Sequence, residues 1–381
     1  MELTEQNEDL AMIRDQAQRF LTESVTAEHL KQLLEQPGSF DRTTWDSAVK
    51  LGWPAISAAE EHGGLGLGWR GICVLAEETG KHALSLPLIP SAAVAESLLS
   101  GLGGPAGATV GVSLVSGEAL SCMALSRSGD AGAAATPEMR YANGRLIGST
   151  AVTPFAAVAD YALITASIGA ETGLFLVELG QIGVHREIVS AIDNSRAAAV
   201  IEFDAAEAML LADGSQAQDA IWQVLSLVAL ATAFAQIGGA QTCLNMARDY
   251  ALERKAFGQQ IGRFQAIKGK LADMYVRIEI ARGCALDALI ALERGDRRWP
   301  GLAAAARLAA IDAYEVAARE NIQTHGAIGV TWEAMPHHHY RSSRALAVEI
   351  GSAMAWRERL LAEVGFDVAK TAPAILSKDG I

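Results

Sequence analysis

The chain has 381 residues, of which half are hydrophobic and a fifth are charged, so it is long enough for two or three domains and too apolar to be disordered. Its formal net charge is −13, which excludes nucleic acid as the main partner because phosphate backbones need a basic surface. The four cysteines include no C-x-x-C pair, the first residues are acidic rather than a signal peptide, and no apolar run reaches about 18 residues. We therefore expect a cytoplasmic protein without disulfides, metal or a membrane span.

Residues 1–115 form the first predicted domain, which is α-helical. Apolar residues recur at helical spacing from Glu5 to about Leu33, and Asp41 is the predicted N-cap of a second helix that ends before Gly52. Further helices are predicted over 69–84 and 91–102.

Residues 116–213 form the second predicted domain. Short β-type runs are separated by Gly, Asn and Asp turns, and Asn143-Gly144 is a typical hairpin turn. One such run, 108–115, overlaps the end of the helical domain. Six or seven strands without intervening helices predict a small antiparallel barrel or sandwich.

Residues 214–381 form the third predicted domain, a helical bundle and oligomer interface. Residues 217–255 read as one very long helix that is apolar nearly all round. Such a helix is buried in a bundle or at a subunit contact.

Four separated motifs together resemble the acyl-CoA dehydrogenase family. They are Ala58–Gly68, Asp193–Asp204, Arg254–Gln265 and Gln323–Glu333. The resemblance covers the whole chain and implies an α+β fold, with an N-terminal helical domain, a middle antiparallel β domain and a C-terminal helical bundle.

The resemblance implies an FAD cofactor and the α,β-desaturation of an acyl-CoA thioester, with an electron-transferring flavoprotein as the acceptor. A guanidinium binds two phosphate oxygens, and glycine permits a sharp turn beside the ligand. In the family, these groups reach across a dimer interface to the FAD of the neighbouring subunit. The implied cofactor contacts are Arg254, Phe257, Gly258, Ile261, Gln265, Gln323 and Ala327.

The catalytic positions depart from the family pattern. The family's usual base position falls on Ile350, one residue after Glu349, and its alternative position falls on Val228. Because one residue turns a helix by about 100°, Glu349 is a catalytic candidate that is out of register. Ser126 and Ser352 are further candidate flavin contacts. The aromatic residue that shields the flavin in the family is replaced near Val152.

This asymmetry predicts a subunit that completes a partner's FAD site in a heteromer of homologous chains, as in family members that act on bulky or steroid acyl-CoA thioesters. Two alternatives stay open: an independent homotetrameric dehydrogenase that uses Glu349 or another carboxylate as the base, and a non-catalytic scaffold subunit.

Several other signals favour structural roles. Gly66–Gly71 matches G-x-G-x-x-G but follows no strand, which argues against a dinucleotide-binding turn. His337, His338 and His339 are consecutive, so they cannot share one metal ion, and we expect them at a surface helix start. His325 is expected to pack as a structural residue. Arg282, Arg307 and Arg319 are expected on solvated helix faces.

Overall fold

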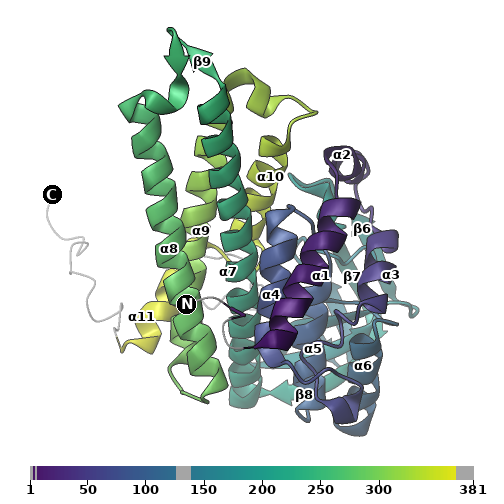
Figure 1. Cartoon of the computed structure of the whole chain (residues 1–381). Helices are drawn as coiled ribbons and strands as arrows, with labels where there is room; N and C mark the ends of the chain where they lie inside the picture. The colour runs from purple at the N-terminus through teal and green to yellow at the C-terminus, as the bar shows by residue number, and fades with distance from the viewer. Residues whose placement is uncertain (1–2, 5–6, 126–138, 366–381) are drawn as a thin grey trace, which may run out of the picture.

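The computed structural model describes residues 3–4, 7–125 and 139–365. Helices α1–α6 come first, the sheet follows in the chain, and α7–α11 form a helical bundle (Figure 1). The type of element changes after Ser116 and again after Asp213, and the division into three domains stays a prediction.

The N-terminal part is helical, and its caps follow from the sequence. Asn7, Thr26 and Asp41 each cap the following helix through a side-chain oxygen. The helices are α1 (Glu8–Ser24), α2 (Ala27–Glu35), α3 (Arg42–Lys50), α4 (Gly68–Lys81), α5 (Leu88–Leu99) and α6 (Gly104–Ser116), with the 3-10 turn η1 (Glu60–His62) before α4.

Two predictions in this part are wrong. The single helix over 5–33 is divided, because Val25 is extended and Thr26 caps a new helix. The strand predicted over 108–115 is part of α6, which has Pro105 in its first turn and ends before the left-handed Gly117. Packing of α6 against α5 outweighs the β preference of its valines.

Within the described residues the sheet has eight strands in the order β6-β7-β3-β2-β4-β5-β8, with β1 also paired to β4. It is mixed, because β1 and β2 run parallel to β4 while the other pairs are antiparallel. The purely antiparallel arrangement predicted from sequence is wrong in this detail, since strand direction follows from connections that a strand pattern does not show. The strands are β1 (Ser121–Ala124), β2 (Arg140–Ala142), β3 (Arg145–Ser149), β4 (Tyr161–Ile168), β5 (Glu171–Glu178), β6 (Val184–Ile188), β7 (Ala199–Glu207) and β8 (Met209–Asp213), with the 3-10 turn η2 (Asn194–Arg196) before β7.

The C-terminal bundle is organised around α7 (Gly214–Glu253), a single helix of 40 residues, as the sequence predicts. By length and composition α7 resembles a membrane span, but 78% of its apolar window is buried inside the protein. It packs against α4, α5, α8 and α9 and against β5 and β8. The remaining elements are the short strands β9 (Lys255–Ala256) and β10 (Gln259–Gln260), the 3-10 turns η3 (Ile261–Arg263) and η4 (Gly326–Val330), and the helices α8 (Gln265–Glu293), α9 (Trp299–His325), α10 (Met335–Val348) and α11 (Ala353–Glu363).

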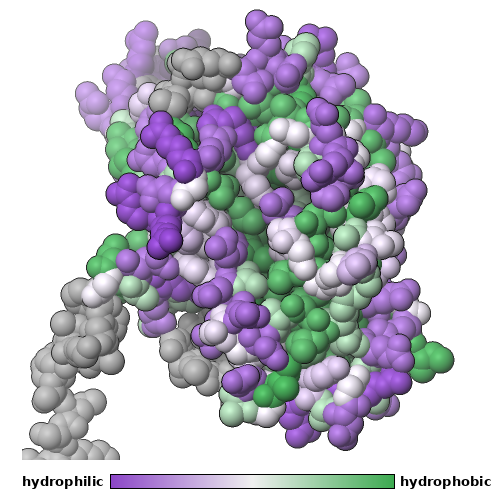
Figure 2. Space-filling model, turned by 90° about the horizontal axis from the view of Figure 1, so that it is seen from below, coloured by the Kyte–Doolittle hydropathy of each residue, from purple (hydrophilic) through white to green (hydrophobic). Residues whose placement is uncertain are grey.

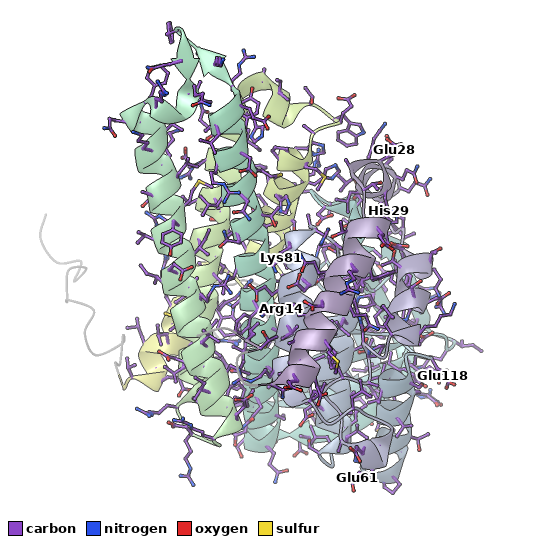
Figure 3. All side chains as sticks on the ribbon, in the orientation of Figure 1. Arg14, Glu28, His29, Glu61, Lys81 and Glu118 are labelled. Atoms are coloured by element: carbon purple, nitrogen blue, oxygen red, sulfur yellow. The ribbon has the colours of Figure 1, made fainter. Side chains whose placement is uncertain are left out.

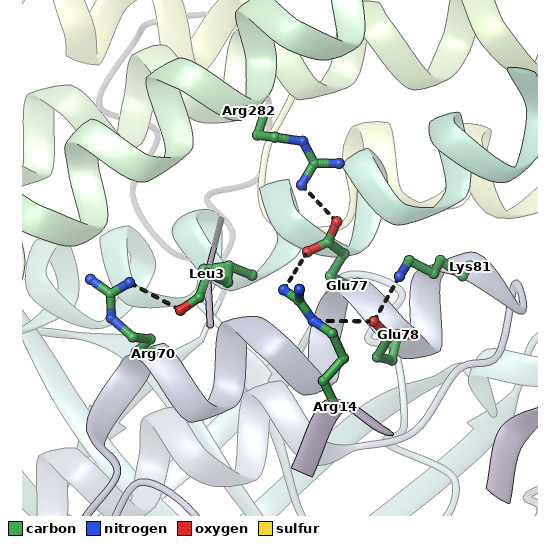
Figure 4. A network of polar contacts seen from close by, with 7 residues as sticks. All are labelled: Leu3, Arg14, Arg70, Glu77, Glu78, Lys81 and Arg282. Carbon is green, nitrogen blue, oxygen red and sulfur yellow. Dashed lines mark hydrogen bonds and ion pairs between the residues drawn. The ribbon is translucent and has the colours of Figure 1, made fainter. Parts of the chain in front are cut away.

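A polar network joins α1, α4 and α8 (Figure 4), and two of its members, Arg14 and Lys81, are labelled on the whole chain in Figure 3. Arg14 of α1 lies 3.7 Å from both Glu77 and Glu78 of α4, and Arg282 of α8 donates to Glu77 at 2.7 Å. Lys81 pairs with Glu78 at 2.7 Å. Arg282 is therefore paired across an interface, and its prediction as a solvated residue is wrong.

On the face seen from below, hydrophobic and hydrophilic residues are interspersed (Figure 2).

Two glycines set the spacing between α4 and α7. A Cβ at Gly80 would lie 1.9 Å from the Ala235 carbonyl oxygen, and a Cβ at Gly238 would lie 2.1 Å from the Glu77 carbonyl oxygen. Both clashes are with backbone, so no side-chain rotation relieves them. The backbones of α4 and α7 touch at this crossing.

We predict that Gly238→Ala lowers the free energy of unfolding by about 2–3 kcal/mol, because the two helices must separate. Gly283→Ala in α8 is the matched control. A Cβ there meets no heavy atom within 4 Å, so the helix propensity of alanine makes this change neutral or stabilising. Urea unfolding of both variants measures the difference, and equal stability of the two would contradict the contact between the helix backbones.

Candidate functional site

The Arg254 motif forms a tight β-hairpin between α7 and α8. Strands β9 and β10 pair antiparallel, and the Ile261 amide donates to the Arg254 carbonyl oxygen at 2.8 Å. Phe257 and Gly258 form the tip with φ of +53° and +80°. Both central residues are left-handed, which is the geometry of a two-residue hairpin turn. This geometry explains the glycine and gives Phe257 an unusual backbone conformation for a non-glycine residue.

The side chains of the hairpin project away from the chain's own core. Phe257 is 96% exposed and meets Phe264 edge-on at 6.3 Å between ring centroids. Arg254 is exposed, and its guanidinium makes no hydrogen bond or ion pair within the described residues. Gln265 is also exposed, and Ile261 is half-buried in η3. A planar donor without an internal partner can bind a phosphate.

The second C-terminal motif lies beside this hairpin. The ring of His325, at the end of α9, stacks on Tyr250 of α7 with centroids 4.3 Å apart. His325 is therefore the packed structural residue that the sequence predicts. Gln323 and Ala327 are exposed next to it, on α9 and η4. The structure thus brings the two predicted cofactor motifs together at one end of the bundle, beside the β9 label in Figure 1.

This end of the bundle is locally cationic on an acidic chain. Exposed basic side chains cluster around the hairpin, namely Arg254, Lys255, Arg263 and Lys268. These residues suit a pyrophosphate group, so the hairpin end fits the phosphate part of a flavin dinucleotide.

A separate pocket lies between α7, the sheet and the end of α10. Val228 and Ile350, the two positions that the resemblance marks for a catalytic base, both line it. Met123 and Phe155, close in sequence to the candidate flavin positions Ser126 and Val152, also line it. The cavity volume is only about 40 Å³. Because ligand pockets usually measure ~300–1,000 Å³, the described residues leave no room for a flavin ring in this pocket.

Glu349 does point into this pocket, where it forms an ion pair with Arg196 of η2. Arg196 also donates to Ser85 Oγ at 2.9 Å, and its guanidinium lies 5.6 Å from the centroid of the Phe155 ring. Burial disfavours the charged guanidinium, but Glu349 and Asp193 outweigh this effect and raise the pKa of Arg196. Sequence reasoning missed Arg196 and Ser85, although Arg196 belongs to the recognised 193–204 motif.

A second guanidinium lies deeper in the bundle. Arg307 is fully buried and donates to Gln236 Oε1 at 2.7 Å and to the Leu346 carbonyl oxygen. Burial lowers the pKa of Arg307 to about 10, against the opposing effect of Glu349. The prediction of a solvated Arg307 is wrong, since the helix face it occupies packs inside the bundle. Arg319, in contrast, is exposed as predicted.

Two further candidates lie away from the hairpin or outside the described residues. Ser352 caps α11, where its side-chain oxygen accepts from the Ala355 amide. Ser126 lies outside the described residues. Val152 is 51% exposed.

The turn at Gly66–Gly71 opens α4 after η1 rather than after a strand, as predicted.

The three histidines of α10 are buried, so the prediction of a surface helix start is wrong. His337 stacks on Trp332 with ring centroids 5.3 Å apart and packs against the tilted ring of His338 at 4.0 Å, and His339 Nδ1 lies 2.9 Å from the Tyr314 hydroxyl. Burial lowers the pKa of His338 and of His339 to about 3. A short polar segment can enter a core when its rings stack, which helix periodicity does not reveal.

Two family models match the chain. The model for the acyl-CoA dehydrogenase N-terminal domain matches residues 7–106, and the model for the C-terminal domain of the same family matches residues 218–365. Together they cover most of both helical parts of the fold and leave most of α6 and the sheet between them.

Individual relatives agree with these models. Acyl-CoA dehydrogenase IpdE2 of Mycobacterium tuberculosis is 40% identical over 141 residues, which is 37% of this chain and 42% of that protein, so this match spans less than half of IpdE2. The human short-chain specific mitochondrial acyl-CoA dehydrogenase is 30% identical and is matched over 80% of this chain and 77% of its own length. The solved structure of a variant of the Tcur3481-Tcur3483 steroid ACAD has a TM-score of 0.86 at 28% identity, covering 94% of this chain and 98% of the other.

We predict that the chain loses stability as the pH falls below about 6.5. The folded chain holds His338 and His339 neutral down to a pH of about 3, whereas the ordinary value is 6.5, so the unfolded state binds more protons in this window. His339→Gln keeps a polar partner for Tyr314 and removes one titration. It should flatten the dependence of the unfolding free energy on pH by up to about 1.4 kcal/mol per pH unit.

Urea unfolding at several pH values measures this slope. His62→Gln, on the surface turn η1, is the matched control and should leave the slope unchanged. An unchanged slope in the His339 variant would mean that the buried ring does not set the acid sensitivity.

Proposed function

Because this chain belongs to the acyl-CoA dehydrogenase family, we propose that it is one subunit of a heteromer, in which it completes the FAD site of a homologous partner chain. The family consists of FAD-dependent oxidoreductases that act on acyl-CoA thioesters. In this reading, the chain shares that activity with its partner.

One observation carries the proposal: a single rigid helix separates the hairpin from the pocket. Val228 lines the pocket and Arg254 ends α7, 26 residues later. At 1.5 Å per residue the helix places them about 39 Å apart. A dinucleotide bound in the chain's own pocket therefore lies beyond the reach of Arg254. The hairpin is suited to a flavin that a second chain holds, whether a copy of this chain or a homologous partner, and the small pocket at Val228 favours the homologous partner.

The surface around the hairpin supports a contact with another protein. Exposed apolar side chains lie among the exposed cations at this end, namely Leu252, Phe257, Ile328 and Val330. Grouped apolar residues rimmed by charge are typical of protein interfaces. Arg254 would bind the pyrophosphate, and Gln323 and the backbone near Ala327 would add hydrogen bonds across the interface.

The pocket at Val228 and Ile350 supports the same division of roles. Its narrow cavity admits about one water molecule and no acyl chain. When bound, FAD supplies the hydride acceptor for the oxidation of the thioester. The partner would then supply the ring pocket and the base that removes the α proton, and this chain would hold the cofactor's phosphates.

The relatives suggest the substrate class. The name of the structurally similar protein, Tcur3481-Tcur3483, has two parts, and that protein is called a steroid ACAD. IpdE2 matches part of this chain. We infer a bulky, steroid-derived acyl-CoA as the substrate of the heteromer. An electron-transferring flavoprotein as the acceptor and a cytoplasmic location complete the proposal.

The position of Glu349 favours a second candidate, a homotetramer that uses this residue as its base. Glu349 lies in the same pocket as Val228 and Ile350. The ion pair with Arg196 and the small cavity weigh against it. A non-catalytic scaffold is the third candidate. The guanidinium of Arg254, which has no partner among the described residues, weighs against a scaffold.

The first test is the flavin absorbance per chain, for the chain expressed alone and with its homologous genomic neighbour. We expect FAD only after co-expression, at less than one per chain. A full complement of FAD in the chain alone overturns the heteromer proposal, and no FAD in either sample supports the scaffold.

The second test replaces Arg254 by Gln in the co-expressed assembly. Loss of a charge-assisted phosphate contact of about 1.5–3 kcal/mol predicts roughly 10- to 100-fold weaker FAD retention. Arg294→Gln is the matched control, because Arg294 is an exposed arginine at the opposite end of α8. Equal FAD retention in both variants would remove Arg254 from the site.

A further inference from the structure

The guanidinium of Arg196 touches all three parts of the fold. Arg196 belongs to η2 of the sheet region, Ser85 belongs to the loop between α4 and α5, and Glu349 follows α10 of the bundle. One guanidinium nitrogen donates to Ser85 Oγ at 2.9 Å, and the other donates to Glu349. A single side chain thus connects the N-terminal helices, the sheet and the C-terminal bundle.

The backbone around Arg196 is strained. This conformation fixes the direction in which the Arg196 side chain points. Ala197 and Phe155 have φ of +44° and +63°, in the left-handed region that non-glycine residues rarely adopt. The Phe155 amide donates to the Arg196 carbonyl oxygen at 2.7 Å, and the Phe155 ring packs under the guanidinium. Strain of this kind persists only where the surroundings determine the conformation.

The charges around the pair are balanced. Glu349 pairs with Arg196, and its charge also opposes the lowering of the pKa of buried Arg307, while buried Asp193 helps to raise the pKa of Arg196. Two cations and two acids therefore compensate one another inside the protein. Removing one member leaves a buried charge without a partner, which costs far more than the pair itself contributes.

We propose that the Arg196–Glu349 ion pair holds the three parts of the fold together in this chain and closes the pocket that contains the two base positions. The pocket that the family resemblance assigns to the base, at Val228 and Ile350, holds this pair. Glu349 is then a counterion rather than a catalytic base. The inference rests on the proposed function in one respect, namely that the flavin of the assembly lies in the partner.

Three variants test the pair in the chain expressed alone. Arg196→Met and Glu349→Gln should each lower the melting temperature by roughly 10 °C, because each leaves an unpaired charge. The double variant with Met at 196 and Leu at 349 should recover most of this loss, since an apolar pair leaves no charge unpaired. Arg277→Met is the matched control. It breaks the exposed pair of Arg277 with Asp312, between α8 and α9, and should shift the melting temperature little.

Hydrogen exchange distinguishes a connection of three parts from a local defect. Both single variants should increase exchange together in the loop after α4, in η2 and at the end of α10. Increased exchange near the mutated residue alone would overturn the proposed connection.

Turnover of the co-expressed assembly separates this inference from the proposed function. Glu349→Gln should keep both turnover and FAD content once the chain is folded. Loss of turnover with an unchanged melting temperature would identify Glu349 as the base and overturn the inference. One FAD per chain in the unaltered assembly, with the melting-temperature losses present, would overturn the proposed function while leaving the structural role of the pair.

Discussion

The burial of α7 is the constraint on which the rest of the structure depends. Its 40 residues contact both other parts of the fold, and the glycine crossing at Gly80 and Gly238 brings α4 within backbone contact. A helix held on so many sides cannot bend to bring its ends together. The pocket wall at Val228 and the hairpin at Arg254 are therefore two separate places, and one cofactor molecule cannot serve both within one chain.

These two places have different chemical characters. The hairpin end exposes cationic and apolar side chains, as is typical of a surface that binds another protein. In the pocket, the charges of Arg196 and Glu349 form an ion pair with each other. The two places therefore differ as the two proposed roles require, with an exposed surface for a partner's cofactor and a small pocket that contains an ion pair.

The order of elements, the long helix and the turn at Arg254 could be predicted from the sequence, because these follow from apolar periodicity, glycine placement and a recognisable motif. The break at Thr26 and the parallel pairing of β1 with β4 could not, since they depend on a local cap and on chain connections. The largest errors concern buried polar residues. Arg307 and His339 look like surface residues in sequence, since their partners, Gln236 and Tyr314, are far away in the chain. For the same reason, the counterion of Glu349 could not be seen in the sequence.

The rigidity of α7 also limits how this chain can change over evolutionary time. Inserting or deleting one residue between Val228 and Arg254 would turn the hairpin by about 100° about the helix axis and shift it by about 1.5 Å. In the proposed assembly, the cofactor of the second chain would then face a different set of side chains. Substitutions along this stretch are tolerated where packing allows, whereas its length would have to match the cofactor that the second chain holds. Two genes of such an assembly would have to accept a change in helix length together.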